Sequence, residues 1–346
     1  MLEDWPAELD ASARCLFLSD PPSGLRAVLV LDDLTLGPAA GGIRTRSYPS
    51  LRDAVRECSA LARAMTLKCS IAGLDAGGGK LVVLDHPGLD RPRAFARLGE
   101  LVEELGGLFR TAGDLGTTAA DLDAMAATCR FVHADETGLA AAVARGLLRC
   151  IEACAEGQGH SLRSLSVGVQ GAGAIGSAVT GALVAAGLRV YVADLDAKRA
   201  ERVAREHGAT VIEPAHLLKA RLDVLAPCAV GGVIGADEAR GLRVWAVCGA
   251  ANNILSDDEA GAVLVERGIA FVPDPVASAG AVIAGIGRSV MGLPDPTPLI
   301  DALGQVARDV LRESAASGEP TPAIAARLAQ RRLERVRARL RARAGK

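Results

Sequence analysis

The chain has 346 residues, of which half are hydrophobic and 23% are charged, and its formal net charge is −2. This composition is typical of a globular protein and argues against a disordered one, and the length predicts two domains rather than one hydrophobic core. The nearly balanced charge and an aromatic content of 3% argue against nucleic acid or an anionic membrane as a partner.

No secretory signal is expected, because the opening residues "MLEDWPAELD" are acidic and polar, and apolar runs are interrupted by arginine before they reach membrane-spanning length. Eight cysteines are scattered through apolar stretches, which is typical of reduced core thiols. The five histidines form no short-spaced ligand pattern with them, so no metal site is expected. The sequence therefore predicts a soluble cytoplasmic protein.

The first half of the chain alternates between predicted strands and helices. Two β-rich runs, residues 14–20 and 24–33, lie around the turn sequence "PPSG" and predict paired strands. Residues 50–68 have apolar side chains at helical spacing, with Ser50 as the N-cap, and predict a helix. The elements expected next are a strand at 80–85, a helix at about 91–105, a strand at 108–114 and a helix beginning near Thr117. This alternation predicts an α/β fold.

A domain boundary is expected at the start of a long apolar helix, predicted over roughly residues 139–155. The first domain is then residues 1–137 and the second is residues 138–320. The second contains six predicted strands, at 165–170, 189–194, 209–212, 223–228, 244–248 and 270–274. The arginine-rich C-terminal helix, about residues 321–346, is expected to pack back on the first domain as a solvated amphipathic helix, in preference to a nucleic-acid arm.

The second domain opens with a dinucleotide-binding motif. Gly171, Gly173 and Gly176 form G-x-G-x-x-G between a predicted strand and a predicted helix. Asp194 ends the next strand at the spacing of about 20 residues that the motif requires, and an acidic residue there favours NAD over NADP. A glycine-rich turn without a ligand is the alternative. The motif predicts a doubly wound Rossmann-type domain.

A second glycine run, Gly77 to Gly79, directly precedes Lys80 and a β-branched strand. Glycines of this kind are expected to turn the backbone sharply and to leave room for another molecule. A lysine buried there would have a lowered pKa, whereas a solvated surface charge is the alternative for the lysine taken alone.

Seven motifs that follow one another along the chain favour a buried Lys80 over a solvated one. They are "GPAAGGIR" at 37–44, "AMTLKC" at 64–69, "GLDAGGGK" at 73–80, "TAGDLGTT" at 111–118, "APCAVGG" at 226–232, "CGAANNIL" at 248–255 and "VPDPVASAGAVI" at 272–283. At these motifs the sequence resembles the amino acid dehydrogenases that include the leucine, phenylalanine, valine and glutamate enzymes.

The resemblance implies NAD-dependent, reversible oxidative deamination of an L-amino acid to a 2-oxo acid and ammonia. It makes residues 1–137 the substrate, catalytic and oligomerisation domain, and it implies a homo-oligomer. Lys68 matches the lysine that pairs with the substrate α-carboxylate, Lys80 the catalytic lysine, and Asp114 the aspartate that shuttles protons with it. The chemistry agrees, because water attack on an iminium needs a base with a pKa near the working pH. Burial and the charge of Lys68 are expected to lower the pKa of Lys80.

The predicted substrate is apolar, either branched-chain or aromatic. The glutamate enzymes have a lysine immediately before the Gly-Gly pair, whereas here Ala40 precedes Gly41 and Gly42. No cation is therefore available for a distal acid, and Ala40, Gly41, Gly42 and Met65 are expected to surround the substrate. The resemblance also assigns the cofactor to a set of residues in the second domain, namely Gly171, Ala172, Gly173, Ala174, Ile175, Gly176, Asp194, Cys228, Ala229 and Asn253.

Two positions depart from the family pattern. Ser278 replaces an asparagine expected near the substrate, and Leu139 replaces a threonine expected near the nicotinamide amide. Loss of both hydrogen-bonding groups would cost a few kcal/mol, roughly, if nothing compensates. Two other hypotheses therefore stay open. One is an NAD-binding relative with little catalysis that acts as a sensor or partner subunit, and the other is an imine-reducing enzyme that uses the same lysine pair.

Overall fold

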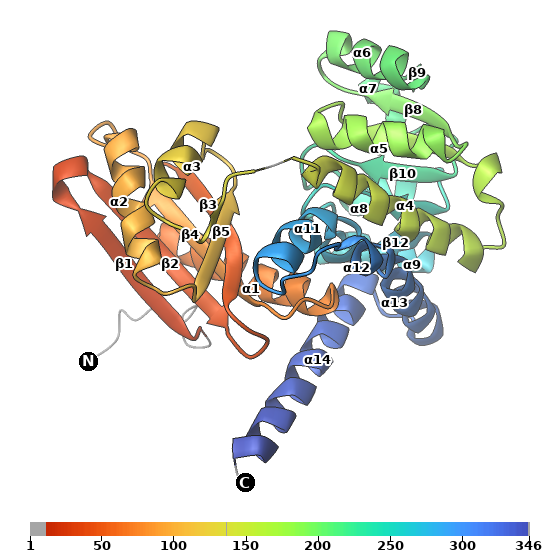
Figure 1. Ribbon diagram of the computed structural model, residues 1–346. Helices are drawn as coiled ribbons and strands as arrows, with labels where there is room; N and C mark the ends of the chain where they lie inside the picture. Colours follow the sequence, from red (N-terminus) through yellow and green to blue (C-terminus); the bar gives the residue numbers. More distant parts are fainter. Residues whose placement is uncertain (1–11, 136, 345–346) are drawn as a thin grey trace. The chain divides into compact units, whose positions relative to one another are not determined.

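The computed structural model describes residues 12–135 and 137–344, which divide into two compact units (Figure 1). Among these residues, unit 1 contains 12–135, 285–293 and 329–344, and unit 2 contains 137–284 and 294–328. Residues 285–293 were expected in the second domain, and the structure corrects this. They belong to unit 1, where Gly285 lies against the His133 ring.

Unit 1 is built on a six-stranded sheet in the order β1-β2-β4-β3-β5-β6. Its strands are β1 (Arg14–Asp20), β2 (Leu25–Asp33), β3 (Ala39–Arg46), β4 (Gly77–Leu84), β5 (Phe109–Gly113) and β6 (Val132–His133). The β1–β2 and β2–β4 pairs are antiparallel, and the others are parallel. The predicted pairing of the first two strands is confirmed. Residues 39–46 were not predicted as a strand, yet they form β3, which occupies a central position between β4 and β5.

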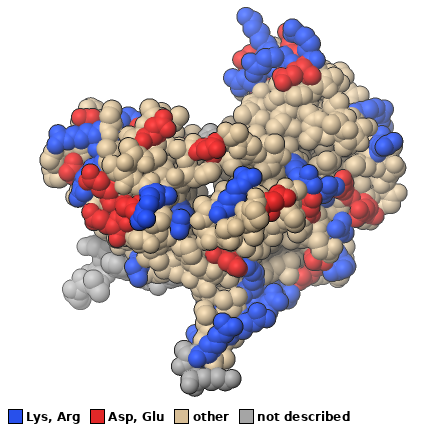
Figure 2. All heavy atoms as spheres, in the orientation of Figure 1, with Lys and Arg blue, Asp and Glu red and all other residues tan. Residues whose placement is uncertain are grey.

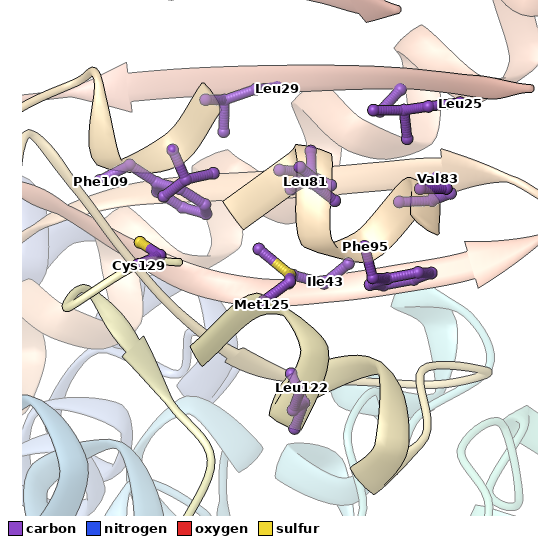
Figure 3. Close-up of a cluster of buried hydrophobic side chains, with 14 of the residues drawn as sticks. Leu25, Leu29, Ile43, Leu81, Val83, Phe95, Phe109, Leu122, Met125 and Cys129 are labelled. Carbon is purple, nitrogen blue, oxygen red and sulfur yellow. The ribbon is translucent and has the colours of Figure 1, made fainter. Parts of the chain in front are cut away.

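Helices cover both faces of this sheet. On one face α2 (Arg91–Glu103) and α3 (Ala119–Ala126) bury Phe95 and Met125 against Leu81 and Phe109 (Figure 3). On the other face α1 (Leu51–Ile71) packs on alternate residues of the strands, including Val82. Side chains alternate between the two faces along a strand, so Lys80 lies on the face of α1 together with Val82.

The glycine run is part of β4 and does not form the sharp turn that the sequence was expected to make. A Cβ atom on Gly78 would lie 2.2 Å from the carbonyl oxygen of Ala62 and from the amide nitrogen of Thr66. The missing side chain therefore admits the backbone of α1 against the sheet. This corrects the expectation that the glycines leave room for a bound molecule, because the neighbouring backbone fills the space at Gly78.

Unit 2 contains a second six-stranded sheet, all parallel, in the order β12-β11-β10-β7-β8-β9. Its strands are β7 (Ser166–Gln170), β8 (Arg189–Ala193), β9 (Thr210–Val211), β10 (Val224–Pro227), β11 (Ala246–Cys248) and β12 (Ala270–Val272). Starting from β7, the chain adds strands first on one side and then on the other. This is the doubly wound order of a dinucleotide-binding domain, so the predicted fold class is confirmed.

The helices that follow α3 belong mostly to unit 2. They are α4 (Leu139–Gly157), α5 (Ala174–Ala185), α6 (Ala197–His207), α7 (Pro214–Leu217), α8 (Ala236–Gly241), α9 (Asp258–Glu266), α10 (Asp274–Ala277), α11 (Gly280–Ser289), α12 (Thr297–Asp301), α13 (Leu303–Ser317) and α14 (Thr321–Ala344). Two 3-10 turns, η2 (Pro21–Ser23) and η3 (Leu162–Ser164), complete the elements. No helix in the described part of the chain is long and apolar enough to cross a membrane.

The last part of α14, from Ala329 onward, belongs to unit 1. The Ser70 hydroxyl at the end of α1 donates a hydrogen bond of 2.7 Å to the Ala329 carbonyl oxygen. Arg332 donates to the Leu74 carbonyl oxygen at 2.7 Å, and Arg337 forms an ion pair with Asp33. Other arginines of α14 remain exposed and give this helix its basic surface (Figure 2).

Candidate active site

Lys80 and Asp114 form a buried ion pair in unit 1. Lys80 lies within β4 and is 5% exposed, and its Nζ is 2.5 Å from Oδ2 of Asp114. Asp114 directly follows β5, and β3 lies between β5 and β4 in the sheet. The pair therefore spans one intervening strand. Gly42 of that strand makes the approach possible, since a Cβ atom there would lie 2.9 Å from Asp114 Cβ and 3.3 Å from Lys80 Nζ.

Burial controls the ionisation of the pair. Desolvation lowers the pKa of Lys80 below the usual lysine value, and although Asp114 opposes this effect, it does not cancel it. Burial also acts to raise the pKa of Asp114, but the Lys80 ammonium and the Arg44 guanidinium outweigh it, so the pKa of this carboxyl is lowered. The result is a lysine that loses its proton more readily than usual beside a carboxylate that stays ionised.

Arg44 is a third member of the site that the sequence reading did not single out. Its Nε donates to Asp114 Oδ2 at 2.9 Å, and its Nη1 donates to Glu57 Oε1 at 2.6 Å. The positive charge of Arg44 contributes to lowering the pKa of Lys80, after the larger effect of burial. Strand alternation could have placed it, because Gly42 and Arg44 are two residues apart and share one face of β3.

The loop that carries Asp114 is tied to β3 by backbone contacts. The amide of Thr45 donates to the Leu115 carbonyl oxygen at 2.9 Å, and the Thr117 hydroxyl donates to that of Ile43 at 2.7 Å. Gly116 has a φ of 78°, and a Cβ atom there would lie 1.9 Å from the Thr45 carbonyl oxygen. These contacts fix the loop, so Asp114 is held in position before any substrate arrives.

The other expected substrate residues have different environments. Ala40 is buried and shares the face of Gly42, whereas a Cβ atom on Gly41 would lie 1.7 Å from the Gly79 carbonyl oxygen. Gly41 thus serves close strand packing. Met65 and Lys68 lie on the last turns of α1 and are partly exposed. Of the expected set, Gly42, Lys80 and Asp114 are the residues whose mutual contacts the structure establishes.

In unit 2 the three motif glycines have separate structural roles. Gly171 has a φ of 101° and lies against Ala229, and a Cβ atom on Gly176 would lie 1.9 Å from the Gly171 carbonyl oxygen. Gly173 is the N-cap of α5 and has no neighbouring heavy atom within 4 Å of the position where a Cβ would stand. Gly173 and Ala174 are exposed, while Ala172 is buried and Ile175 partly buried. Open space beside free amides at the start of a 12-residue helix fits a dinucleotide pyrophosphate.

Asp194 holds the glycine-rich loop. Its Oδ2 accepts a hydrogen bond of 2.7 Å from the Ala172 amide, and its Oδ1 accepts one of 2.9 Å from the Asp196 amide. Burial acts to raise the pKa of Asp194, but these amides and Arg199 lower it overall, so the carboxylate is ionised. The Arg199 guanidinium lies 3.7 Å from Asp194 Oδ1. The carboxylate expected to meet a ribose thus also has a structural role.

The remaining expected cofactor residues follow β10 and β11. Cys228 directly follows β10, and burial raises the pKa of its thiol to about 12, so it stays neutral. Ala229 packs against Gly171. Asn253 has a φ of 51°, the one positive value among the described non-glycine residues, and its carbonyl oxygen accepts a hydrogen bond of 2.7 Å from the Gly232 amide.

The two positions that depart from the family pattern also lie in unit 2. Ser278 is buried, and its hydroxyl donates a hydrogen bond of 2.6 Å to the Asp274 carbonyl oxygen. Leu139 is the first residue of α4, where the preceding Gly138 is the N-cap and provides no side-chain cap. The Ser278 hydroxyl proton is therefore used within the protein.

Comparisons with known proteins agree with these observations. The family model of the Glu/Leu/Phe/Val dehydrogenase dimerisation domain matches residues 14–131, and that of Glutamate/Leucine/Phenylalanine/Valine dehydrogenase matches residues 191–286. Leucine dehydrogenase from Thermoactinomyces intermedius is 33% identical over 339 residues, which cover 94% of this chain and 91% of that protein. Phenylalanine dehydrogenase from Bacillus thermotolerans is 32% identical over 285 residues, covering 78% and 74%. The crystal structure of L-tryptophan dehydrogenase from Nostoc punctiforme has a TM-score of 0.86 at 27% identity and covers 98% of this chain and 100% of that one.

Proposed function

Because the chain belongs to the Glu/Leu/Phe/Val dehydrogenase family, we propose that it catalyses the reversible oxidative deamination of an apolar L-amino acid. The observation that carries this proposal is the buried pair of Lys80 and Asp114, with 2.5 Å between Nζ and Oδ2. The products are the 2-oxo acid, ammonia and the reduced cofactor.

Lys80 supplies the base that the reaction needs. Removal of hydride from Cα leaves an iminium ion. Hydrolysis of the iminium requires a water molecule that loses a proton as it attacks the carbon. A lysine with a lowered pKa can accept that proton at a lower pH than an ordinary lysine, which would still be protonated there. Asp114 accepts a hydrogen bond from Lys80 and can take up or return the proton as the tetrahedral adduct expels ammonia.

The dinucleotide supplies a hydride acceptor when it is bound. The residues that would hold it are the glycine-rich loop from Gly171 to Gly176 and Asp194, and the N-terminal amides of α5 would face the pyrophosphate. An ionised Asp194 favours a free ribose hydroxyl over a 2′-phosphate, so NAD is the proposed cofactor. Arg199 at 3.7 Å from Asp194 Oδ1 is the group that would favour NADP if it turned outward.

The substrate is proposed to be branched-chain or aromatic. The named relatives act on leucine, phenylalanine and tryptophan, which are all apolar. In this chain, Ala40 stands where the glutamate enzymes place a lysine, and it is buried on the same face of β3 as Gly42. Lys68 on the last turn of α1 would pair with the α-carboxylate. The first domain matches a model named for dimerisation, so we also propose a homo-oligomer assembled through unit 1.

The test is a panel of L-amino acids incubated with the purified full-length protein and either NAD or NADP. Leucine, valine, isoleucine, phenylalanine, tryptophan and glutamate are compared by the absorbance of the reduced cofactor. We expect reduction of NAD with at least one apolar member and much less with glutamate. Dinucleotide binding without reduction by any member would instead support the sensor or partner-subunit hypothesis. The Ser278 hydroxyl, which donates a hydrogen bond to the Asp274 carbonyl oxygen, is an observation that motivates this hypothesis.

A further inference from the structure

We propose that Arg44 is a positioning residue that links Glu57 of α1 to the Asp114 carboxylate and thereby sets the geometry and charge of the Lys80 site. The proposal rests on the proposed function for its kinetic consequences, but it also makes a prediction about Lys80 that needs no turnover.

Arg44 and Lys80 donate to the same carboxylate oxygen. Arg44 Nε lies 2.9 Å from Asp114 Oδ2, and Lys80 Nζ lies 2.5 Å from it. Arg44 Nη1 also donates to Glu57 Oε1 at 2.6 Å, and the Arg44 side chain is 19% exposed. Two cations and two carboxylates therefore form one chain of charge-assisted hydrogen bonds that is largely removed from water.

This chain joins side chains from three elements of unit 1. Arg44 is on β3, Glu57 is on α1, and Asp114 is on the loop after β5. The backbone contacts of that loop fix its path, but the direction of the Asp114 side chain depends on its hydrogen-bond partners. Without Arg44, the partners of the carboxylate would be Lys80 and the backbone amide of Leu115, and the carboxylate could turn with the amine when the amine moved toward substrate. Arg44 provides a further side-chain attachment that does not move in the reaction.

The charges around Lys80 can be assigned to each neighbouring element. The strand β2 places the apolar Val30 opposite it, β3 contributes Arg44, and α1 contributes the Cys58 thiol, which donates to the Lys80 carbonyl oxygen at 3.2 Å. Glu57 has two further neighbours, namely Arg46, whose Nη1 lies 3.8 Å from Glu57 Oε1, and the Tyr48 phenol. The positive charge of Arg44 lowers the pKa of both Lys80 and Asp114, so it favours a neutral amine beside an ionised carboxylate. Glu57 partly neutralises that charge.

Opposite shifts are therefore expected from two substitutions. In Arg44→Gln the repulsion of Lys80 is lost, and the acidic limb of the kcat/KM profile moves to higher pH by about 0.5 unit or more. In Glu57→Gln the charge of Arg44 is less neutralised, and the limb moves to lower pH. Arg44→Lys should restore the position of the limb but not the full kcat, because an ammonium cannot hold two carboxylates as a planar guanidinium does.

The kinetic test compares these three variants with the wild type and with Arg46→Gln. Arg46 is on the same strand, but its side chain is 51% exposed and lies no closer to the site than 3.8 Å from Glu57 Oε1, so its variant should move the limb much less than Arg44→Gln does. We expect kcat of Arg44→Gln to fall about tenfold or more while KM for the amino acid changes little. An Arg44→Gln variant with reduced thermal stability but an unchanged pH profile would show a merely structural role and overturn the proposal.

A second measurement separates this proposal from the proposed function. The rate at which an acylating reagent modifies Lys80 is followed against pH by peptide mass mapping, in the wild type and in Arg44→Gln. We expect the apparent pKa of Lys80 to rise in the variant, whether or not any amino acid is turned over. Identical titration of Lys80 in the two proteins would refute the role of Arg44 even if the dehydrogenase activity is found.

Discussion

Lys80 and Asp114 are 34 residues apart in the chain, and their side chains meet at 2.5 Å. They meet across β3, which lies between β4, the strand that carries Lys80, and β5, the strand that Asp114 follows. Neither residue is remarkable alone, since lysine at a strand and aspartate after one are common at protein surfaces. On the α1 face of the sheet, burial lowers the pKa of Lys80, and the charges of Lys80 and Arg44 lower the pKa of Asp114.

Removal of the amine should abolish most of the activity. We expect Lys80→Ala to lower kcat by roughly 10²- to 10⁴-fold, which is the usual contribution of a general base. Lys80→Arg should be as inactive, because a guanidinium stays protonated. Steady-state kinetics with the best substrate of the panel measure the loss, and dinucleotide binding to the same variants is the control. A Lys80→Ala enzyme with wild-type kcat would remove the proposed mechanism.

The pH dependence of activity should reflect the lowered pKa of Lys80. The base acts when it is neutral, so kcat/KM for deamination should rise with pH and level off below the ordinary lysine pKa of 10.5. Asp114 opposes the lowering, so Asp114→Asn should move this limb to lower pH while kcat falls. Rate profiles of the two proteins decide the matter. A limb that moves to higher pH in Asp114→Asn would contradict the assigned sign.

Gly78→Ala should destabilise unit 1. The added methyl group would lie 2.2 Å from backbone atoms of Ala62 and Thr66, which cannot rotate away. We expect the free energy of unfolding to fall by about 3 kcal/mol and amide exchange in α1 and β4 to accelerate. Gly157→Ala at the end of α4 is the control, since nothing lies within 4 Å of its Cβ position. Equal stability of the two variants would mean that α1 packs less closely than described.

The motif glycines of unit 2 should separate cofactor binding from folding. Gly173→Ala adds a methyl group in open space, so stability should stay within about 1 kcal/mol of the wild type, while KM for the dinucleotide rises about tenfold or more. Gly176→Ala would place its methyl group 1.9 Å from the Gly171 carbonyl oxygen and should lower the melting temperature. Calorimetry and cofactor titration distinguish the two. A Gly173→Ala protein with unchanged cofactor affinity would argue against a pyrophosphate at this helix.

Arg332 should anchor the C-terminal helix to unit 1. Its guanidinium donates to four acceptors at the end of α1, namely the carbonyl oxygens of Ser70, Gly73 and Leu74 and the carboxylate of Asp75. Arg332→Ala leaves those carbonyls without this donor, and we expect a loss of about 2 kcal/mol in the free energy of unfolding. Limited proteolysis should then cleave α14 more readily. The exposed Arg339, changed to alanine, is the matched control, and equal protease resistance of both variants would contradict the anchor.

Local sequence patterns determined much of this protein. The helix after Ser50 begins at Leu51 as predicted, with the Ser50 hydroxyl as its cap, and it ends at Ile71, three residues later than expected. The strand pattern and glycine spacing of the second half predicted a doubly wound sheet, which the strand order confirms. The motifs also indicated the dehydrogenase family, which the family models and relatives confirm. Each of these features can be recognised in short stretches of sequence, from a helix-capping residue, from the periodicity of apolar residues or from the spacing of glycines.

The tertiary structure decided what depends on strand order. It placed Gly77 to Gly79 inside β4, where they admit the backbone of α1 instead of forming a turn. It brought Arg44 to the carboxylate of Asp114, and it assigned residues 285–293 to unit 1. Packing distances between backbones and the sharing of one carboxylate by two cations arise only when β3 lies between β4 and β5. No local pattern carries that information, because a strand's neighbours in a sheet are chosen by the whole domain.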